Sequence, residues 1–237
     1  MKHLDSLSSA STHSLRRMFP WLELSDEQLT SIIAFSTSAQ QYAEAAGLTS
    51  SDLEETFFLS QVAPAITGWR LVRPAAGWRI ADLGAGAGSF AVTAAILCPA
   101  TYVLAVDSSR RHAEFIQNEA KALQLGNLEV IAERIESAAS RSPYAAGFDL
   151  VGCRALAAGS KPFELSRPLI RPGGSLFLWR TTAGVVEHQP PFLHISQLDL
   201  SSYAPRLTVA RYDIRTPERL WPGNAAFPSA RDDVPGE

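Results

Sequence analysis

A glycine-rich turn is the first place in this sequence where residue types and spacing suggest chemistry. The turn reads Gly84-Ala-Gly86-Ala-Gly88, it follows the apolar segment Trp78–Leu83, and Asp82 stands two residues before its first glycine. Glycines allow a tight turn and let the backbone approach a ligand closely, and a helix that begins after such a turn offers free N–H groups. The segment therefore predicts a ligand site between a strand and a helix.

A second acid strengthens this prediction. Asp107 lies nineteen residues after Gly88, directly after the apolar segment Thr101–Val106. In parallel α/β sheets, an acid at the end of the second strand accepts hydrogen bonds from the hydroxyls of a ribose. The order of strand, glycine turn, helix, strand and acid favours a nucleotide-containing ligand over plain packing of a strand against a helix.

The spacing and charge of the turn distinguish two cofactor classes. NAD-binding turns read Gly-x-Gly-x-x-Gly, whereas this turn has glycines at 84, 86 and 88 and an acid before them. S-adenosylmethionine carries an ammonium and a sulfonium but no phosphate, so the carboxylate of Asp82 suits it and would repel a pyrophosphate. We therefore predict S-adenosylmethionine as the cofactor, and a NAD-dependent oxidoreductase is the disfavoured alternative.

Strands and helices must alternate around this turn to position such a site, and the sequence indicates that they do. The expected strands are Trp78–Leu83, Thr101–Val106, Leu128–Ala132, Phe148–Cys153 and Ser175–Trp179, and the expected helices between them are Ser89–Cys98, Arg110–Leu125 and Lys161–Ile170. This alternation predicts an α/β fold with a Rossmann-like doubly wound sheet. We further expect a turn at Pro172–Gly174, a loop at Thr181–Pro191 and a late edge strand at Arg206–Ile214.

A helical preamble precedes the sheet. Ser25-Asp-Glu-Gln28 is a capping box that opens a helix through about Ala46, and Ser51-Asp-Leu-Glu54 opens a second helix that ends near Pro64 or Ile66. We therefore divide the chain into three parts. They are a flexible N-terminus (1–23), a single methyltransferase-like domain (24–221) with its preamble (24–70) and Rossmann-like core (78–214), and a disordered tail (222–237).

Composition limits the classes of partner. The chain has 237 residues, 46% of them hydrophobic, and a net charge of −3, which argues against non-specific binding to nucleic acid or acidic membranes. We expect no DNA and no membrane partner, and a cytoplasmic location, because the sequence shows no signal peptide and Phe90–Cys98 is too short to cross a bilayer. Neither the two cysteines nor the five histidines show metal-ligand spacing, and His112 is expected on an exposed part of a helix.

Several short segments share one family pattern. They are Leu24–Leu29, Leu48–Thr49, Ile80–Gly88, Val106–Ser108, Glu133–Glu136, Phe148–Ala155, Arg171–Gly174 and Thr216–Pro222. Over about Leu24 to Trp221 the chain resembles the RsmG family (glucose-inhibited division protein B), guanine-N7 methyltransferases of small-subunit ribosomal RNA. The pair of Arg134-x-Glu136 and Arg154-Ala155 at this spacing is more selective than the glycine turn, which many methyltransferases share.

The resemblance implies roles for individual residues. It places Gly84 and Ser89 at the methionine part of the cofactor, Ile135 and Glu136 beside the adenine, and Arg154 at the edge of the site. The complete set of expected cofactor-binding residues is Asp82, Gly84, Gly86, Gly88, Ser89, Asp107, Arg134, Ile135, Glu136 and Arg154. Arg154 and Arg180 are the expected catalytic residues, which would hold RNA phosphate or guanine O6 while N7 stays free to attack.

Positions on the substrate side depart from the family. Its Trp-Asn pair is replaced by Gln41-Tyr42-Ala43, its His by Phe57 and its Asp by Ser60, and the tail at Arg231–Glu237 is acidic. The leading hypothesis is methyl transfer to guanine N7 of small-subunit ribosomal RNA, free or in the assembling subunit. The alternatives are a divergent methyltransferase of another RNA, a protein or a small molecule, and a cofactor-binding protein without turnover.

Overall fold

The computed structural model describes residues 12–46, 57–154, 159–181, 188–203 and 207–214. Their strands are β1 (Arg79–Leu83), β2 (Tyr102–Asp107), β3 (Leu128–Ala132), β4 (Phe148–Arg154), β5 (Ile170–Thr181), β6 (His188–Gln189), β7 (Phe192–Asp199) and β8 (Leu207–Ile214). They form one sheet in the order β3-β2-β1-β4-β5-β8-β7-β6. The first five strands pair in parallel and the last three are antiparallel.

The strand order reverses between β1 and β4, because the chain runs from β1 through β2 to β3 on one side and returns to β4 on the other. In open α/β sheets, ligands bind outside the carboxyl ends of the strands at such a reversal. The glycine turn follows β1 at this point, as the sequence predicted. The Rossmann-like doubly wound fold is therefore confirmed, with an antiparallel extension.

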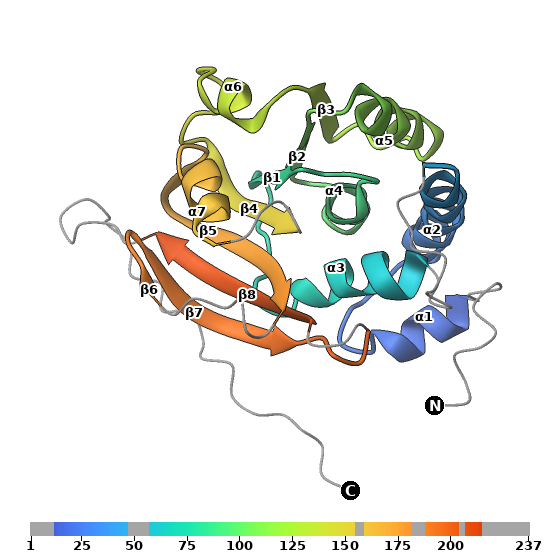
Figure 1. The fold of residues 1–237 in the computed structure, drawn as a ribbon. Coiled ribbons are helices and arrows are strands. Elements are labelled where there is room, and N and C mark those ends of the chain that lie inside the picture. The colour runs from blue at the N-terminus through green and yellow to red at the C-terminus, as the bar shows by residue number, and fades with distance from the viewer. Residues whose placement is uncertain (1–11, 47–56, 155–158, 182–187, 204–206, 215–237) are drawn as a thin grey trace, which may run out of the picture.

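Helices cover both faces of the sheet (Figure 1). The described helices are α1 (Thr12–Met18), α2 (Asp26–Ala46), the π-helix η2 (Phe58–Val62), α3 (Ala63–Gly68), α4 (Ser89–Leu97), α5 (Arg110–Ala122), α6 (Ile135–Ala139) and α7 (Lys161–Ser166). Residues of α1 to α5 pack on one face and those of α6 and α7 on the other, so that each face has its own apolar core. Burial on both faces explains why the central strands read as continuous apolar runs.

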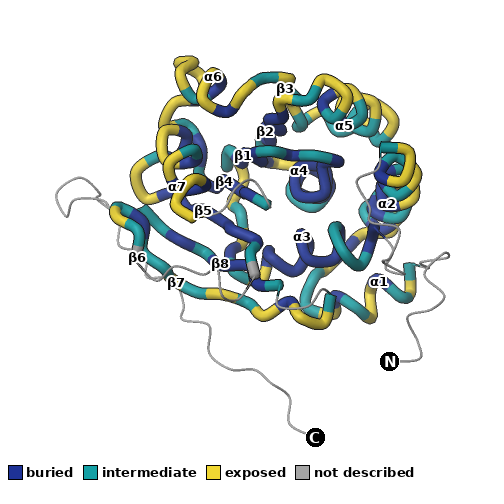
Figure 2. Tube along the Cα trace, in the orientation of Figure 1, coloured by how far each residue is buried: buried dark blue, intermediate teal, exposed yellow. Residues whose placement is uncertain are grey.

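Helix α4 is almost entirely buried (Figure 2). Eight of its nine residues are buried, because α2 and α3 of the preamble cover the side that would otherwise face water. The Gln28 side chain of α2 donates to the Ile96 carbonyl oxygen at 2.9 Å, and the Trp69 ring stacks on Phe90 at a centroid distance of 5.3 Å. The preamble is thus part of the core that holds the glycine turn.

The first predicted capping box forms as expected. The Gln28 backbone N–H donates to Ser25 Oγ, and the Ser25 N–H donates to Gln28 Oε1, both at 3.1 Å. The helix that follows, α2, is described as far as Ala46, and residues 47–56 lie outside the described residues. The second capping box, Ser51–Glu54, lies outside the described residues, and the helix expected after it takes the form of η2 followed by α3 and ends at Gly68.

Three expectations about the elements were wrong. The expected flexible N-terminus contains α1, whose Leu15 is fully buried. The helix predicted at Lys161–Ile170 ends at Ser166, because Pro168 lacks an N–H and Ile170 already pairs with Phe148. The late strand β8 is not an edge strand, since it lies between β5 and β7.

Two irregular segments also differ from expectation. Pro172–Gly174 is a bulge inside β5 and not a turn before it, because Phe148 pairs with Ile170 while Leu150 pairs with Ser175. Gly173 accommodates the bulge at φ +75°. Within the expected loop Thr181–Pro191, residues 188–189 form β6, and 182–187 lie outside the described residues, as does the tail 222–237.

Gly152 of β4 faces the ring of Phe90, and this contact yields a test of the packing. A Cβ at Gly152 would stand 2.3 Å from Phe90 Cε1, and Trp69 and Trp179 block movement of that ring at centroid distances of 5.3 and 5.0 Å. We expect Gly152→Ala to lower the free energy of unfolding by about 1–3 kcal/mol in urea denaturation. The control Gly126→Ala, where a Cβ meets nothing within 4 Å, should change it by less than about 0.5 kcal/mol. Equal stability of the two variants would contradict this packing.

Candidate active site

The glycine turn has the backbone that its sequence requires. Gly84, Gly86 and Gly88 adopt φ values of +69°, +56° and +80°, which other residues rarely adopt. A Cβ at Gly88 would also lie 2.9 Å from Ile116 Cγ1 of α5, whereas a Cβ at Gly86 meets nothing within 4 Å. Gly88 therefore permits the close approach of α4 and α5, and Gly86 borders open space.

Asp107 holds the turn in place. Its Oδ2 accepts the Gly86 N–H and its Oδ1 accepts the Ser109 N–H, both at 2.8 Å. The Asp107 residue is only 9% exposed. Each carboxylate oxygen can accept two hydrogen bonds, so both oxygens keep capacity for a further donor such as a ribose hydroxyl.

Asp82 is the second buried carboxyl group of the site. It is 3% exposed, and its Oδ2 accepts the Ala91 N–H of α4 at 3.0 Å. The pKa of Asp82 is raised from 3.8 to about 7, mainly by burial and also by the charge of Asp107, while the hydrogen bond from Ala91 and the charge of Arg154 oppose the rise. A cationic group beside Asp82 would favour its ionised form.

Arg154 ends β4 at the same edge of the sheet, but it contacts the preamble. Its guanidinium donates to the Gln61 carbonyl oxygen at 2.9 Å and to the Ser60 carbonyl oxygen, both in η2. Burial lowers the pKa of Arg154 to about 10, and the charge of Asp82 opposes this shift. The sequence placed Arg154 at the edge of the site, and the structure shows that these hydrogen bonds join β4 to a π-helical turn, an element often found at functional sites.

Arg180 lies next to Arg154 in the sheet, because β5 pairs with β4 and sets Trp179 opposite Arg154. The Arg180 Nη2 donates to the Gly159 carbonyl oxygen at 2.6 Å, and the guanidinium lies over the Phe163 ring at 5.6 Å. Its side chain is half-buried at the carboxyl edge. The two arginines predicted as catalytic thus share one edge with the glycine turn.

The remaining predicted residues divide into two groups. Ser89, the first residue of α4, is buried behind the glycine turn, and Ile135 is buried at the start of α6, which follows β3 at the carboxyl edge. Arg134 and Glu136 flank Ile135 and are exposed. The structure therefore gathers Asp82, the glycine turn, Ser89 and Asp107 into one cluster. Residues 134–136 follow β3, which pairs with β2, the strand that ends in Asp107.

His112 is less exposed and closer to the site than the sequence led us to expect. It was expected on an exposed part of a helix, but its side chain is 23% exposed and its Nδ1 lies 3.3 Å from Asp107 Oδ1. A sequence signal was present, since Ser109 caps α5 and its Oγ accepts the His112 N–H.

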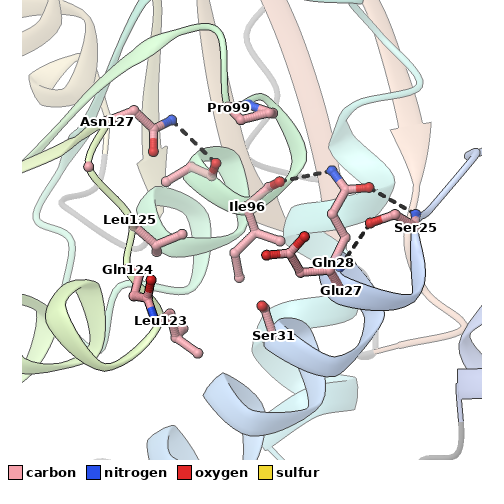
Figure 3. Close-up of a pocket in the computed structure, with 12 residues that line it drawn as sticks. Ser25, Glu27, Gln28, Ser31, Ile96, Pro99, Leu123, Gln124, Leu125 and Asn127 are labelled. Carbon is pink, nitrogen blue, oxygen red and sulfur yellow. Dashed lines mark hydrogen bonds between the residues drawn. The ribbon is translucent and has the colours of Figure 1, made fainter.

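A cavity of about 710 Å³ lies elsewhere, between the start of α2 and the ends of α4 and α5 (Figure 3). Polar side chains line it, including Gln28 and Asn127, and Asn127 Nδ2 donates to the Ala95 carbonyl oxygen at 3.3 Å. The cavity is at the amino edge of the sheet, whereas the glycine turn is at the carboxyl edge. The cavity and the candidate site are therefore at different places, and the candidate site is defined by the chemistry of its side chains.

Two negative findings concern the described residues only. None of their His, Cys, Asp and Glu side chains gather in groups of three or more that could hold a metal ion. None of the helices in the described ranges is long and apolar enough to cross a membrane.

Comparisons with known proteins agree with this geometry. The ribosomal RNA small subunit methyltransferase G of Polynucleobacter asymbioticus is 28% identical over 207 residues, 85% of this chain and 92% of that protein. The protein of the same name from Syntrophomonas wolfei is 38% identical over 104 residues, which span 44% of this chain and about half (48%) of that protein.

Among solved structures, a SAM dependent methyltransferase from Aquifex aeolicus matches with a TM-score of 0.55 at 13% identity and covers 73% of this chain and 98% of its own. At this identity the likeness concerns the fold alone. A family model described as rRNA small subunit methyltransferase G matches residues 28–189. Because this match extends over more than half of the sequence, the chain belongs to the family of small-subunit ribosomal RNA methyltransferases G.

Proposed function

We propose that this protein transfers the methyl group of S-adenosylmethionine to guanine N7 of small-subunit ribosomal RNA. One observation carries the proposal: in a chain of this family, two buried carboxylates, Asp82 and Asp107, flank a glycine turn at the carboxyl edge of the sheet. The acceptor follows from the names of the relatives, and N7 follows from the family resemblance.

The residues present fit S-adenosylmethionine better than a dinucleotide. The space beside Gly86 admits a ligand, and the carboxyl group of Asp82 is buried where a cation would stabilise its charge. These features suit a ligand with an ammonium and a sulfonium, and they disfavour NAD.

We assign each part of the cofactor to residues at the carboxyl edge of the sheet. Gly84 and Ser89 border the methionine part, Asp107 accepts the ribose hydroxyls, and Ile135 with Arg134 and Glu136 borders the adenine. The burial of Ile135 and the exposure of its two neighbours support this assignment, since an adenine needs an apolar wall with a polar rim.

The bound cofactor would supply an electrophilic methyl group on its sulfonium. Guanine N7 has a free lone pair, so the protein needs no general base and contributes alignment and charge control. Arg180 is half-buried at the carboxyl edge, and we assign it to guanine O6 or an RNA phosphate. Arg154 has two hydrogen bonds to η2. We therefore propose that it holds the preamble against the carboxyl edge of the sheet, where the glycine turn lies.

A second candidate, methylation of a different acceptor, is favoured by the preamble. Phe57 stands where the family has a His, and it is 5% exposed and packs edge-on against Phe35 at 6.4 Å. The position is therefore in the core of this protein and offers no polar group to a substrate.

If the acceptor is small-subunit ribosomal RNA, free or in the assembling subunit, the protein acts in the cytoplasm.

The proposed function is tested by transfer of a tritiated methyl group to small-subunit ribosomal RNA that lacks the modification. We expect label in the RNA, and 7-methylguanosine in its nuclease digest by mass spectrometry. Label in another RNA, a protein or a small molecule would favour the second candidate. Cofactor binding without transfer to any of these acceptors would show a protein without turnover.

Arg180→Gln should separate acceptor binding from cofactor binding. We expect methyl transfer to the RNA to fall by about tenfold or more, because one charge-assisted hydrogen bond is lost, while the affinity for S-adenosylhomocysteine stays unchanged. Arg167→Gln is the matched control, since Arg167 is exposed after α7 at the opposite edge. Equal activity of the two variants would remove Arg180 from the acceptor site.

Asp107→Asn tests the ribose assignment. An amide accepts hydrogen bonds less strongly than a carboxylate, so we expect the affinity for S-adenosylhomocysteine in calorimetry to fall by at least about tenfold. Wild-type protein should bind S-adenosylhomocysteine and not NAD. Unchanged affinity in a folded Asp107→Asn variant would reduce Asp107 to a residue that only shapes the turn.

Asp82→Asn tests the buried acid through the pH dependence of stability. Because the pKa of Asp82 is raised in the folded protein to about 7 from 3.8, the folded state binds the proton more tightly than the unfolded chain does. The stability conferred by this group is therefore fully present below about pH 4 and is lost as the pH rises through about 7. In urea denaturation without ligand, Asp82→Asn should lack this loss, and parallel pH profiles of variant and wild type would refute the shift.

A further inference from the structure

A group of side chains on α2 and α5 gathers around His112, which lies next to Asp107. His112, on the first turn of α5, has its Nδ1 3.3 Å from Asp107 Oδ1. Tyr42, near the end of α2, meets the edge of the His112 ring at a centroid distance of 6.2 Å and stacks on Phe115 at 4.0 Å. We call Tyr42, His112 and Phe115 the Asp107 support cluster.

Two polar atoms of this cluster have unused hydrogen-bonding capacity. Among the residues that the structure describes, Tyr42 Oη and His112 Nδ1 are buried and lack a hydrogen-bond partner. Such atoms are rare in native proteins and need an explanation. Asp107 Oδ1 accepts the Ser109 N–H, and a carboxylate oxygen can accept a second donor, here from the side of His112.

The electrostatic environment of Tyr42 supports the same arrangement. Burial raises the pKa of Tyr42, and the negative charge of Asp107 raises it further, while the positive charge of Arg111 opposes the rise. The Arg111 guanidinium lies over the Tyr42 ring at 5.5 Å and donates to the Ala45 carbonyl oxygen at 3.1 Å. The end of α2 is thus held against the start of α5, beside Asp107.

We propose that His112 is a positioning residue that donates its Nδ1–H to Asp107 and fixes the carboxylate in the orientation that a ribose hydroxyl requires. Tyr42 holds the imidazole in place through its ring. The inference rests on the proposed binding of the ribose by Asp107. The present distance of 3.3 Å is long, and hydrogen bonds of this kind tighten when the ligand binds. The helical preamble then contributes to the cofactor site through Tyr42.

The chain itself explains why Asp107 needs a third donor. The two backbone N–H groups hold opposite oxygens of the carboxylate, one from the glycine turn and one from the residue that caps α5. A donor on Oδ1 from His112 would occupy the second position of that oxygen and leave the remaining position of Oδ2 for one ribose hydroxyl. A neutral imidazole with its proton on Nδ1 supplies such a donor without adding charge.

The test is a double-mutant cycle that measures the affinity of the full chain for S-adenosylhomocysteine by calorimetry. His112→Leu and His112→Asn are each made in the wild-type protein and in the Asp107→Asn variant. With Asp107 intact, we expect His112→Leu to weaken binding about tenfold and His112→Asn, whose amide replaces the Nδ1–H, to bind within about threefold of wild type. In the background that carries Asp107→Asn, His112→Leu should weaken binding by no more than about twofold further.

Asn118→Leu is the matched control, because Asn118 is exposed on the same helix, α5, outside the Asp107 support cluster, and this variant should bind as the wild type does. The proposal is overturned if His112→Leu binds as the wild type, if its loss is the same in both backgrounds, or if His112→Asn restores nothing. Because the readout is cofactor affinity, a failure of wild-type protein to methylate RNA would overturn the proposed acceptor and not this inference.

Discussion

The carboxylate of Asp107 joins the two elements on which the active edge depends. One oxygen holds the Gly86 N–H of the turn after β1, and the other holds the Ser109 N–H at the start of α5. Backbone amides paired with a buried carboxylate make strong, directional hydrogen bonds. The conformation of the glycine turn and the position of α5 are therefore coupled through a single side chain, and a ligand that contacts Asp107 acts on both.

The preamble is a structural part of this edge and not an appendage. Together with the sheet it buries eight of the nine residues of α4, and Arg154 ties η2 to the end of β4. The aromatic rings of Trp69, Phe90 and Trp179 fill the space between α3, α4 and β5. Trp179 also donates its Nε1–H to the Pro64 carbonyl oxygen at 3.1 Å, so the two layers share a buried polar contact as well as apolar surface.

The features that the sequence alone could predict are those that depend on the spacing of residues close together in the chain. The glycine turn, its two acids, the alternating strands and helices, and the first capping box each follow from residues close together in the chain. The bulge at Pro172–Gly174 and the interior position of β8 could not be predicted, because both depend on which strands pair. Likewise, the contacts of Arg154 with η2 and of Tyr42 with His112 join segments whose proximity only the fold determines.

We place the cofactor at the carboxyl edge against Asp107, and not in the cavity of about 710 Å³ at the amino edge. The most direct measurement is a titration with S-adenosylhomocysteine that follows the amide resonances of the protein by NMR. We expect the amide resonances of Gly86 and Ser109 to shift, since both donate to Asp107, while those of Gly126 and Asn127 in the cavity do not. Shifts confined to Gly126 and Asn127 would contradict this placement.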